Sequence, residues 1–530
     1  MAATAPATRQ YRTTLLLAAS VALLAAFHPR PALGQEFRIL EASIEEIHQA
    51  FDIGDLSCVE LVQGYLDRIE RFDREGPAIH AVQTVNPEAL ERARELDRLH
   101  AASGPIGSLH CVPVLVKDQV EVAGMPTTYG SALFADFDSG RDATIVVRMR
   151  EVGAIILGKA TMGEFAQGYA GSAFGLCRNV YALDRNPSGS SCGSGIAAAA
   201  NFSAVTIGED TGGSIRGPAA HTSTVGLRPT LPLVSRFGMF MGSPTRDTLG
   251  PITRTVRDAA ILTGVIAGYD PNDPVTARSV GNVPESYTTF LREDALEGAR
   301  LGVIRTPMSD DTDPESADYG QVRDVIDRAI AEFEAGGAEI VDSLEIAGLV
   351  ELLREAGSNH ETETAVDAYL AELDDPPVQS LVEIAVSDQL TARRRHDHIG
   401  SLNRTTDEPA YLKSQAAREK LRIVVLAAMA DHGLDALVYS TFDHSPALIP
   451  PDVLTNPDAP DDYGKGSNRG LSPALGFPAL TVPAGFTSDG FPVGIEFLGR
   501  PFSEGVLFGL GYAYEQATMH RRPPATTPAL

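Results

Sequence analysis

The chain has 530 residues, of which 43% are hydrophobic and 21% are charged, and its formal net charge at pH 7 is −27. This length and composition are typical of a soluble globular protein with a large core. So acidic a surface repels nucleic acid and anionic membranes. We therefore expect neither a nucleic-acid partner nor stable membrane insertion.

The N-terminal segment has the pattern of a secretory signal peptide. Residues 13–27, "TTLLLAASVALLAAF", form an apolar run after two arginines. The run is shorter than the roughly 20 residues that span a bilayer. Ala32 and Gly34 are small residues at the −3 and −1 positions of a cut after Gly34. We predict that residues 1–34 are a signal peptide and that the mature protein is periplasmic or secreted; an uncleaved membrane anchor is the alternative.

Three stretches in the first third of the chain indicate the fold class. Residues 57–73 have helical apolar spacing, with Ser57 as the predicted N-cap and Glu60 as its capping-box partner. The stretches 110–120 and 154–160 are almost continuously apolar, with helical patterns around them. Strands that are apolar on both faces and alternate with helices indicate an α/β fold whose sheet is covered by helices on both faces.

Four cysteines are present: Cys58, Cys111, Cys177 and Cys192. Export would permit disulfides, and four cysteines allow three full pairings, among which the sequence does not choose. Their spacing is unlike that of a zinc site. Because four cysteines are few for so long a chain, we expect packed thiols or at most one bridge.

The rest of the chain has the pattern of one continuous domain. Residues 305–465 are more variable, with acidic helices and a loop-rich segment, and a closing helix is predicted over 504–518. No internal repeat and no long linker interrupts the pattern. We therefore predict a single domain over residues 35–530, with variable substrate-side insertions around 305–465.

Three short motifs invite functional interpretations that their context disfavours. "GAIILGKA" (153–160) has phosphate-loop spacing, but an alanine replaces the hydroxyl residue, so Lys159 is expected at the end of a strand. "GSSCG" (189–193) matches a hydrolase nucleophile elbow but follows a loop rather than a strand. His396 and His398 stand two apart in "RRRHDHIG" with no third ligand nearby. We expect a solvated helix face there rather than a metal site.

Lys117 interrupts the strand "VPVLVKDQV", which ought to be buried. Burying an ammonium group costs several kcal/mol unless it is paired or deprotonated. A desolvated lysine can lose its proton near neutral pH and act as a general base. The alternative is a buried ion pair with Asp118 or another carboxylate. This stretch alone does not decide between the two.

Two glycine-rich loops, 187–195 and 209–217, each contain serine. In the second loop the glycines allow several backbone amides to point the same way and to hold a developing oxyanion. A serine at the end of such a row is well placed to attack a carbonyl, given a base. The alternative for either loop is an ordinary turn before a helix. The candidate amides are those of Thr211, Gly212, Gly213 and Ser214.

Taken together, these segments resemble the amidase signature family. "VPVLVKDQVEVAGMPTTYGS" is similar to the family's lysine segment, and "PSGSSCGSGIAAAA" and "IGEDTGGSIRGPAAHTSTVGLRPT" are similar to its two serine loops. "GPITRTVRDAAIL" and "PALTVPAGFTSDGFPVGIEFLGRPF" resemble later landmarks. The first serine loop has "SGSSCGS" in place of the usual GGSSGGS, which resembles the peptide-amidase-like bacterial members. The similarity runs from about residue 40 to 520 and is weakest over 305–465.

The resemblance implies a fold and a set of roles. The fold would be a large mixed, mostly parallel central sheet with helices on both faces. The catalytic residues would be Lys117 as base, Ser190 as a serine held through a cis peptide, and Ser214 as nucleophile. The four amides named above would form the oxyanion hole, Asp210 and Arg216 would brace the loop, and no metal or organic cofactor is implied.

The expected function is an exported serine amidase that hydrolyses a small or peptide C-terminal carboxamide through an acyl-enzyme. One alternative is the A-type subunit of a glutamine-dependent amidotransferase, which the signal peptide and the acidic charge disfavour. The other is an esterase or carbamate hydrolase of the same family. No residue of the sequence identifies the natural substrate.

Overall fold

The computed structural model describes residues 37–459 and 463–530, so the predicted signal peptide lies outside the described residues. Residues Arg38–Leu530 form one compact unit. None of the helices in the described ranges combines the length and the hydropathy that a membrane span needs.

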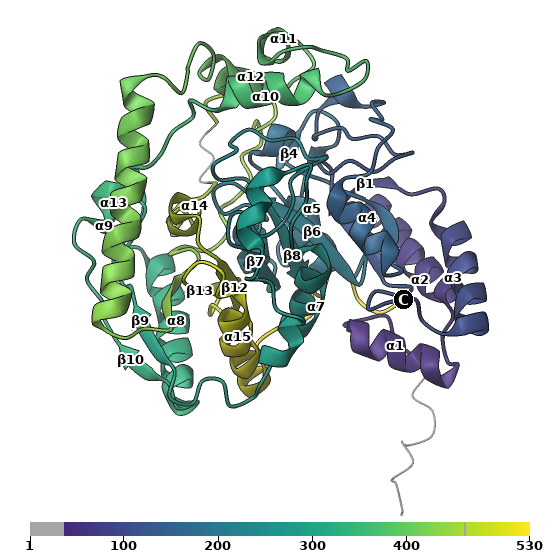
Figure 1. The fold of residues 1–530 in the computed structure, drawn as a ribbon, viewed down its shortest axis with the longest axis horizontal. Coiled ribbons are helices and arrows are strands. Elements are labelled where there is room, and N and C mark those ends of the chain that lie inside the picture. Colours follow the sequence, from purple (N-terminus) through teal and green to yellow (C-terminus); the bar gives the residue numbers. More distant parts are fainter. Residues whose placement is uncertain (1–36, 460–462) are drawn as a thin grey trace, which may run out of the picture. The chain divides into compact units, whose positions relative to one another are not determined.

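An eleven-stranded sheet runs through this unit, with helices flanking it (Figure 1). Its strands lie in the order β1-β3-β2-β6-β8-β7-β12-β13-β11-β9-β10. Strands β4 and β5 pair separately. The bounds are β1 (Val82–Val85), β2 (Pro113–Lys117), β3 (Ile155–Ala160), β4 (Ala170–Gly171), β5 (Gly175–Leu176), β6 (Val205–Asp210), β7 (Val225–Arg228), β8 (Thr248–Thr253), β9 (Arg300–Val303), β10 (Glu339–Val341), β11 (Ala436–Ser440), β12 (Ala479–Phe486) and β13 (Pro492–Leu498).

The sheet is mixed, as expected, but most of its strand pairs are antiparallel, so the expectation that it is mostly parallel is wrong. Strands β3, β2 and β6 run parallel, as do β11, β9 and β10. The centre, from β6 through β8, β7, β12 and β13 to β11, is antiparallel, and so is the edge pair of β1 and β3. An apolar run reports burial on both faces but not strand direction, which depends on the connections.

Helices pack against this sheet and against one another. The bounds are α1 (Ile44–Ile53), α2 (Cys58–Arg68), α3 (Ala89–Ser103), α4 (Thr144–Glu151), α5 (Cys192–Ala199), α6 (Arg216–His221), α7 (Val256–Ile266), α8 (Ala317–Ala335), α9 (Leu349–Glu355), α10 (Thr362–Ala371), α11 (Leu381–Val386), α12 (Ala392–Ile399), α13 (Pro409–Asp431), α14 (Leu471–Leu475) and α15 (Glu504–Thr518). The predicted closing helix therefore has the bounds of α15.

The capping box predicted at residue 57 is present at the start of α2. The Glu60 amide donates to the Ser57 hydroxyl at 3.2 Å, and the Ser57 amide donates to the Glu60 carboxylate at 2.8 Å. These bonds satisfy two backbone donors that a helix N-terminus otherwise leaves free. The predicted helix continues beyond α2 as a π-helical segment, Ile69–Arg74.

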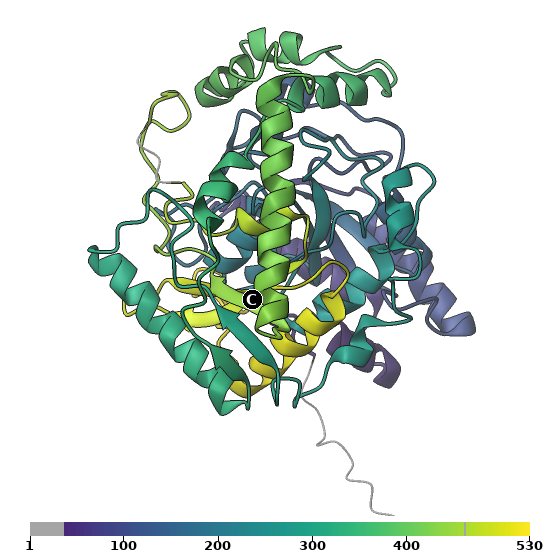
Figure 2. The same ribbon diagram turned by 60° about the vertical axis from the view of Figure 1, so that its left-hand side comes forward.

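The segment 305–465 forms both a helical layer and part of the sheet. It contains strands β10 and β11 as well as helices α8 to α13. Figures 1 and 2 show α10, α11 and α12 as a layer at the top of the molecule, with the long helix α13 running down from it. This layer lies over the serine loops, which places the variable segment at the candidate site.

Both cysteine pairs are joined, so the expectation of at most one disulfide is wrong. Cys58 pairs with Cys111 and Cys177 pairs with Cys192, with Cα–Cα distances of 5.4 and 6.2 Å. The first bridge ties α2 to the residues before β2. The second ties the start of α5 to the residue after β5. Sequence spacing did not indicate these contacts, because tertiary packing brings the partners together.

Loss of either bridge is expected to destabilise the protein. Opening a loop of 15 residues by a Cys177→Ala/Cys192→Ala change should lower the free energy of unfolding by about 3 kcal/mol. The Cys58→Ala/Cys111→Ala change opens a loop of 53 residues and should cost about 4 kcal/mol. Urea unfolding with and without reductant measures both effects. A wild-type curve that does not move when free thiols appear would contradict this expectation.

Candidate active site

Lys117 is fully buried at the end of β2, where two parallel strands end side by side. Its Nζ donates to the Ser190 Oγ at 2.7 Å and to the Glu209 carboxylate at 2.7 Å. The structure therefore shows the buried ion pair that the sequence offered as one interpretation, and it also places the Lys117 Nζ against a serine hydroxyl, while the role of Lys117 as a base stays a prediction. The carboxylate partner is Glu209 at the end of β6, not Asp118.

Burial lowers the pKa of Lys117, because removing an ammonium from water disfavours its charged form; the neighbouring Glu209 carboxylate opposes this shift only in part. A lysine with a lowered pKa gives up its proton more readily than an exposed one. Once neutral, its Nζ can accept a proton from the hydroxyl that it already contacts.

Asp118 has a different partner, Lys159. The two charges lie 3.4 Å apart and both side chains are fully buried. Lys159 also donates to the Thr127 hydroxyl at 2.9 Å. Lys159 lies within β3, in agreement with the prediction that it belongs to a strand rather than to a phosphate loop. This second buried pair lies next to the Lys117 site, since β2 and β3 are neighbouring parallel strands.

Hydrogen bonds from the amide and the hydroxyl of Ser191 join the first serine loop to the second. The Gly189–Ser190 peptide bond is cis. The Ser191 hydroxyl donates to the Glu209 carbonyl at 3.0 Å and accepts from the Glu209 amide at 3.1 Å. The Ser191 amide donates to the Ser214 carbonyl at 3.3 Å. The Ser191 hydroxyl is therefore bonded to backbone groups, whereas the Ser190 hydroxyl contacts Lys117.

The second serine loop leaves β6 and brings Ser214 to the wall of a cavity. Gly213 has φ of +112°, and a Cβ there would lie 2.5 Å from the Arg469 side chain, so only glycine fits. The Gly213 amide donates to the Asp210 carboxylate at 2.8 Å. Among the described residues, no hydrogen bond occupies the other three amides of the predicted oxyanion hole, those of Thr211, Gly212 and Ser214.

Asp210 and Arg216 form a buried ion pair within this loop. The Arg216 Nε lies 3.2 Å from the Asp210 carboxylate, and its Nη1 lies 2.6 Å from Glu496 on β13. Arg228 is a second cation at 3.2 Å from Asp210. Burial alone would raise the pKa of Asp210, but the Arg216 and Arg228 guanidiniums outweigh it and hold that pKa well below its usual range. The network joins the loop to the sheet.

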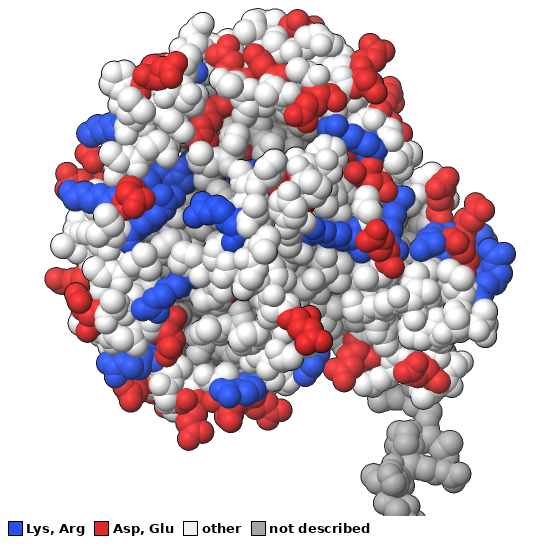
Figure 3. Space-filling view, in the orientation of Figure 1, with Lys and Arg blue, Asp and Glu red and all other residues white. Residues whose placement is uncertain are grey.

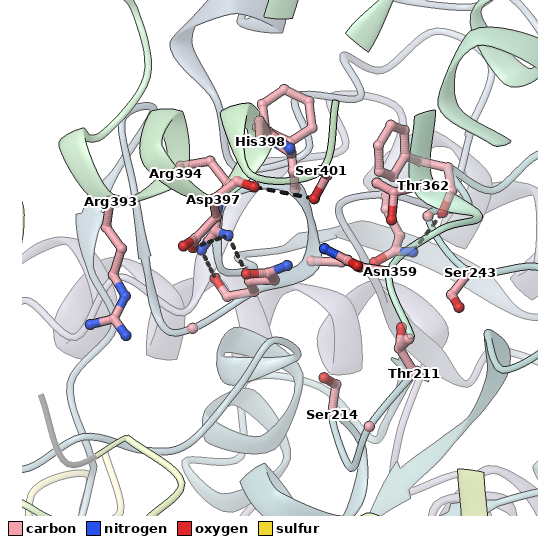
Figure 4. A pocket seen from close by; sticks show the side chains of 18 of the residues that line it. Thr211, Ser214, Ser243, Asn359, Thr362, Arg393, Arg394, Asp397, His398 and Ser401 are labelled. Carbon is pink, nitrogen blue, oxygen red and sulfur yellow. Dashed lines mark hydrogen bonds and ion pairs between the residues drawn. The ribbon is translucent and has the colours of Figure 1, made fainter. Parts of the chain in front are cut away.

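Ser214 opens onto a cavity of about 740 Å³ and is 8% exposed. In Figure 4, Ser214 and Thr211 lie on one side of this space, and Arg393, Arg394 and His398 lie on the other. The latter three belong to α12, in the layer formed by the variable segment. The cavity is therefore bounded by the serine loop below and by α12 above.

The interpretation of "RRRHDHIG" as a solvated helix face is wrong for the side that faces the cavity. Arg394 and His398 are buried, and the His398 ring packs edge-on to Phe165 with centroids 5.2 Å apart. Arg394 pairs with Asp397 at 2.9 Å. Residues four apart share one helix face. The contact between Phe165 and His398 helps to bury that face of α12. In the described part of the chain, Arg393 has no hydrogen-bonding or ion-pair partner.

Sequence reasoning missed Asp247, which lies just before β8 and lines the cavity. It is 2% exposed, and one carboxylate oxygen accepts from the amides of Gly242 and Ser243 at 2.9 and 2.8 Å. The other oxygen has no partner among the described residues. Burial, together with the nearby Glu209 charge, raises the pKa of Asp247 to about 7.

The Asp247→Asn variant should reveal this shift in its stability profile. Because the pKa is raised in the folded state, the folded protein holds more protons than the unfolded chain between about pH 4 and 7. Wild-type stability therefore falls, through this group, as the pH rises across that window. Asparagine does not titrate, so the variant should gain up to about 4 kcal/mol relative to wild type between pH 4 and 8. Urea unfolding at each pH tests this, and parallel profiles would refute it.

The other residue missed by sequence reasoning is Glu209. Its signal was present in the stretch "GEDTGG", because a carboxylate at the end of one buried strand is a natural partner for a lysine at the end of the next.

One cluster of three potential metal ligands occurs in the described residues, formed by Cys58, His110 and Cys111. Two of its three ligand atoms are the sulfurs of a disulfide.

Comparison with known proteins assigns the chain to a family. Residues 60–508 match the family model described as Amidase. A probable amidase of Arabidopsis thaliana is 35% identical over 514 residues, covering 93% of each chain. The A-type subunit of the glutamyl-tRNA(Gln) amidotransferase of Gloeothece citriformis is 32% identical over 516 residues, covering 91% of this chain and 99% of the relative.

A solved structure extends the match to three dimensions. The native peptide amidase from Stenotrophomonas maltophilia superposes with a TM-score of 0.81 at 32% identity, covering 92% of this chain and 99% of that one. The motifs, the mixed sheet and these similarities agree. The chain belongs to the amidase family, with the amidase signature, and is an amide-hydrolysing enzyme.

Proposed function

We propose that this protein is an exported serine amidase that hydrolyses a small or peptide C-terminal carboxamide through an acyl-enzyme. The observation that carries the proposal is the 2.7 Å contact between Lys117 Nζ and Ser190 Oγ, in a loop bonded to the loop of Ser214. A base with a lowered pKa, a hydroxyl that can relay a proton and a serine facing a cavity are the parts that nucleophilic catalysis needs.

In the proposed acylation step, neutral Lys117 accepts the proton of Ser190, and Ser190 accepts that of Ser214. The Ser214 Oγ then forms a bond to the amide carbonyl carbon. The negative charge that develops on the carbonyl oxygen is held by free backbone amides of the second loop. The three amides without a hydrogen bond among the described residues, those of Thr211, Gly212 and Ser214, suit this task, while the Gly213 amide keeps Asp210 in place.

Collapse of the tetrahedral intermediate breaks the carbon–nitrogen bond. The leaving nitrogen takes a proton from Ser190, which is replenished by the ammonium of Lys117, so that ammonia or an amine departs neutral. Water then attacks the ester on Ser214 through the same relay and releases the carboxylic acid. Glu209 holds Lys117 in position, and Asp210 with Arg216 holds the loop.

The similarity to a peptide amidase supports a carboxamide at the end of a peptide as the substrate. A cavity of about 740 Å³ has room for more than the amide group itself. Similarity to an amidotransferase component is comparable in identity, but a net charge of −27 is unfavourable for a tRNA partner. Ester and carbamate hydrolysis would use the same attack, and the test below includes an ester.

A substrate panel tests the proposal. Ammonia release should be measured from a blocked dipeptide amide and from glutamine, and acid release from the methyl ester of the same dipeptide. We expect kcat/KM for the dipeptide amide to exceed that for glutamine at least tenfold. Glutamine as the best substrate would favour the amidotransferase alternative, and the ester as the best would favour an esterase.

Export is proposed from residues 1–34 and has its own test. The full-length gene should be expressed in a Gram-negative host and the protein recovered from separated periplasm and cytosol. We expect the periplasmic protein to begin at residue 35 when its N-terminus is sequenced. Active protein retained in the cytosol with residues 13–27 intact would overturn this part of the proposal.

A further inference from the structure

A second cavity, of about 530 Å³, lies on the other side of the loop that borders the catalytic cavity. Gly242, Ser243, Arg246 and Asp247 line the catalytic cavity, whereas Pro244 and Thr245 between them line the second one. No residue of the described chain lines both cavities. The volume lies within the roughly 300–1,000 Å³ of small-molecule sites, and the mechanism proposed above does not use this cavity.

The floor of the second cavity is apolar. It is built by residues from three separate parts of the chain, Leu231, Pro232, Leu475, Phe477 and Phe502. Ile423, on α13, is 59% exposed beside them. Leu475 and Phe477 also belong to the hydrophobic core, whereas Leu231 and Phe502 are only partly buried. Apolar surface that is still exposed to the cavity gains free energy when an apolar ligand removes it from water.

Among the described residues, the walls of the same cavity carry four arginines and one acidic residue, Glu419. The arginines are Arg236, Arg278, Arg418 and Arg422. Figure 3 shows basic side chains gathered on the face that includes α13. This is a local excess of positive charge on a protein whose net charge is −27, and it attracts anions to an otherwise acidic molecule.

Arg418 is the innermost of these cations and has no counter-ion in the part of the chain that the structure describes. It is 2% exposed, and its guanidinium donates to the carbonyls of Ala474, Pro473 and Thr245 at 3.1, 3.2 and 2.9 Å, and to the Thr245 hydroxyl at 2.6 Å. No carboxylate of the described chain lies within ion-pair distance of it. Burial lowers its pKa to about 10. A buried charge is costly unless it is paired.

The other three arginines differ in how far they are neutralised. Arg236 is held by both oxygens of Asp273, with distances of 2.9 Å. Arg422 contacts Glu419 at 3.2 Å on the exposed side of α13. Within the described ranges, the exposed side chain of Arg278 has neither an ion pair nor a hydrogen bond. Arg418 and Arg278 therefore have no carboxylate partner within the described ranges, and Arg422 has only an exposed one, so these three cations remain for a ligand.

We infer that this cavity is a binding site for the carboxylate of an apolar acid. The carboxylate lies against Arg418, Arg278 and Arg422, and the hydrocarbon chain lies along the apolar floor. Guanidinium groups match a carboxylate in shape and charge. A phosphate ion would leave the floor in water, and a neutral lipid would leave Arg418 without a counter-ion, so the two features together select an amphipathic anion.

Calorimetric titration of the full chain with decanoate, below its micellar concentration, tests the site. We expect saturable binding of one decanoate and at least tenfold weaker binding of 1-decanol, which has the same chain without the charge. Equal binding of the two probes, or no binding of decanoate at millimolar concentration, would overturn the inference.

Variants then locate the bound probe. The Arg278→Gln/Arg422→Gln variant should bind decanoate at least tenfold more weakly. Arg98→Gln, at an exposed arginine on α3, is the matched control and should leave the affinity unchanged. Arg393→Gln, in the catalytic cavity, should also leave it unchanged. A loss of binding in Arg393→Gln but not in the double variant would place the probe in the catalytic cavity and refute the site.

Discussion

The Ser214→Ala variant is expected to lose amide hydrolysis almost completely, with kcat/KM reduced by about 10⁴-fold or more. The reason is that the proposed acyl-enzyme forms on the Ser214 Oγ, for which alanine offers no replacement. Stability should change little, because the Ser214 side chain borders a cavity and its hydroxyl makes no hydrogen bond with the described residues. Ammonia release and urea unfolding measure the two effects.

Ser191→Ala is the matched control for this variant. Ser191 lies in the neighbouring loop, and its hydroxyl is bonded to the backbone of Glu209 at both 3.0 and 3.1 Å. Removing these bonds should cost about 1–3 kcal/mol of stability. Activity should fall far less than in Ser214→Ala. Equal losses of activity in both variants would mean that disturbance of the serine loops, and not loss of the nucleophile, inactivates the Ser214→Ala variant.

The second large effect is expected at Lys117. The Lys117→Met variant should be inactive, because methionine cannot accept a proton. It should also lose about 3–5 kcal/mol of stability, since the change leaves the buried Glu209 carboxylate without its partner. Urea unfolding and ammonia release again report the two quantities separately.

A double variant separates the structural role of this lysine from its catalytic one. In Lys117→Met/Glu209→Gln no charge remains at this pair, so most of the lost stability should return. Activity should stay absent, because the base is still missing. Recovery of amide hydrolysis along with stability would show that Lys117 only supports the fold, and would remove it from the proposed mechanism.

Activity should also report the titration of Lys117. In the mechanism, the neutral amine is the reactive form, so kcat/KM should rise with pH until this group is deprotonated. Because burial lowers the pKa of Lys117, this rise should occur below the usual range of lysine. A rise only in the range of an exposed lysine would contradict its assignment as the base.

The sequence by itself determined the features that depend on neighbours along the chain. The continuous apolar runs place the buried strands that contain Lys117 and Lys159. Side-chain hydrogen bonding over three residues places the capping box at Ser57. The ordered lysine and serine motifs, through their resemblance to a known family, pointed to an amidase, and the family match confirms it.

Only the tertiary structure decided which distant groups meet. Lys117 contacts Glu209, and Asp118 contacts Lys159, because the ends of three adjacent parallel strands lie side by side. The helix that carries Arg393 covers the catalytic cavity because the long segment before it folds back over the serine loops. Strand direction and cysteine pairing were also decided by the tertiary structure and not by the local sequence. Local propensity and apolar period say how a segment folds and which face it buries, but they carry no information about what packs against that face.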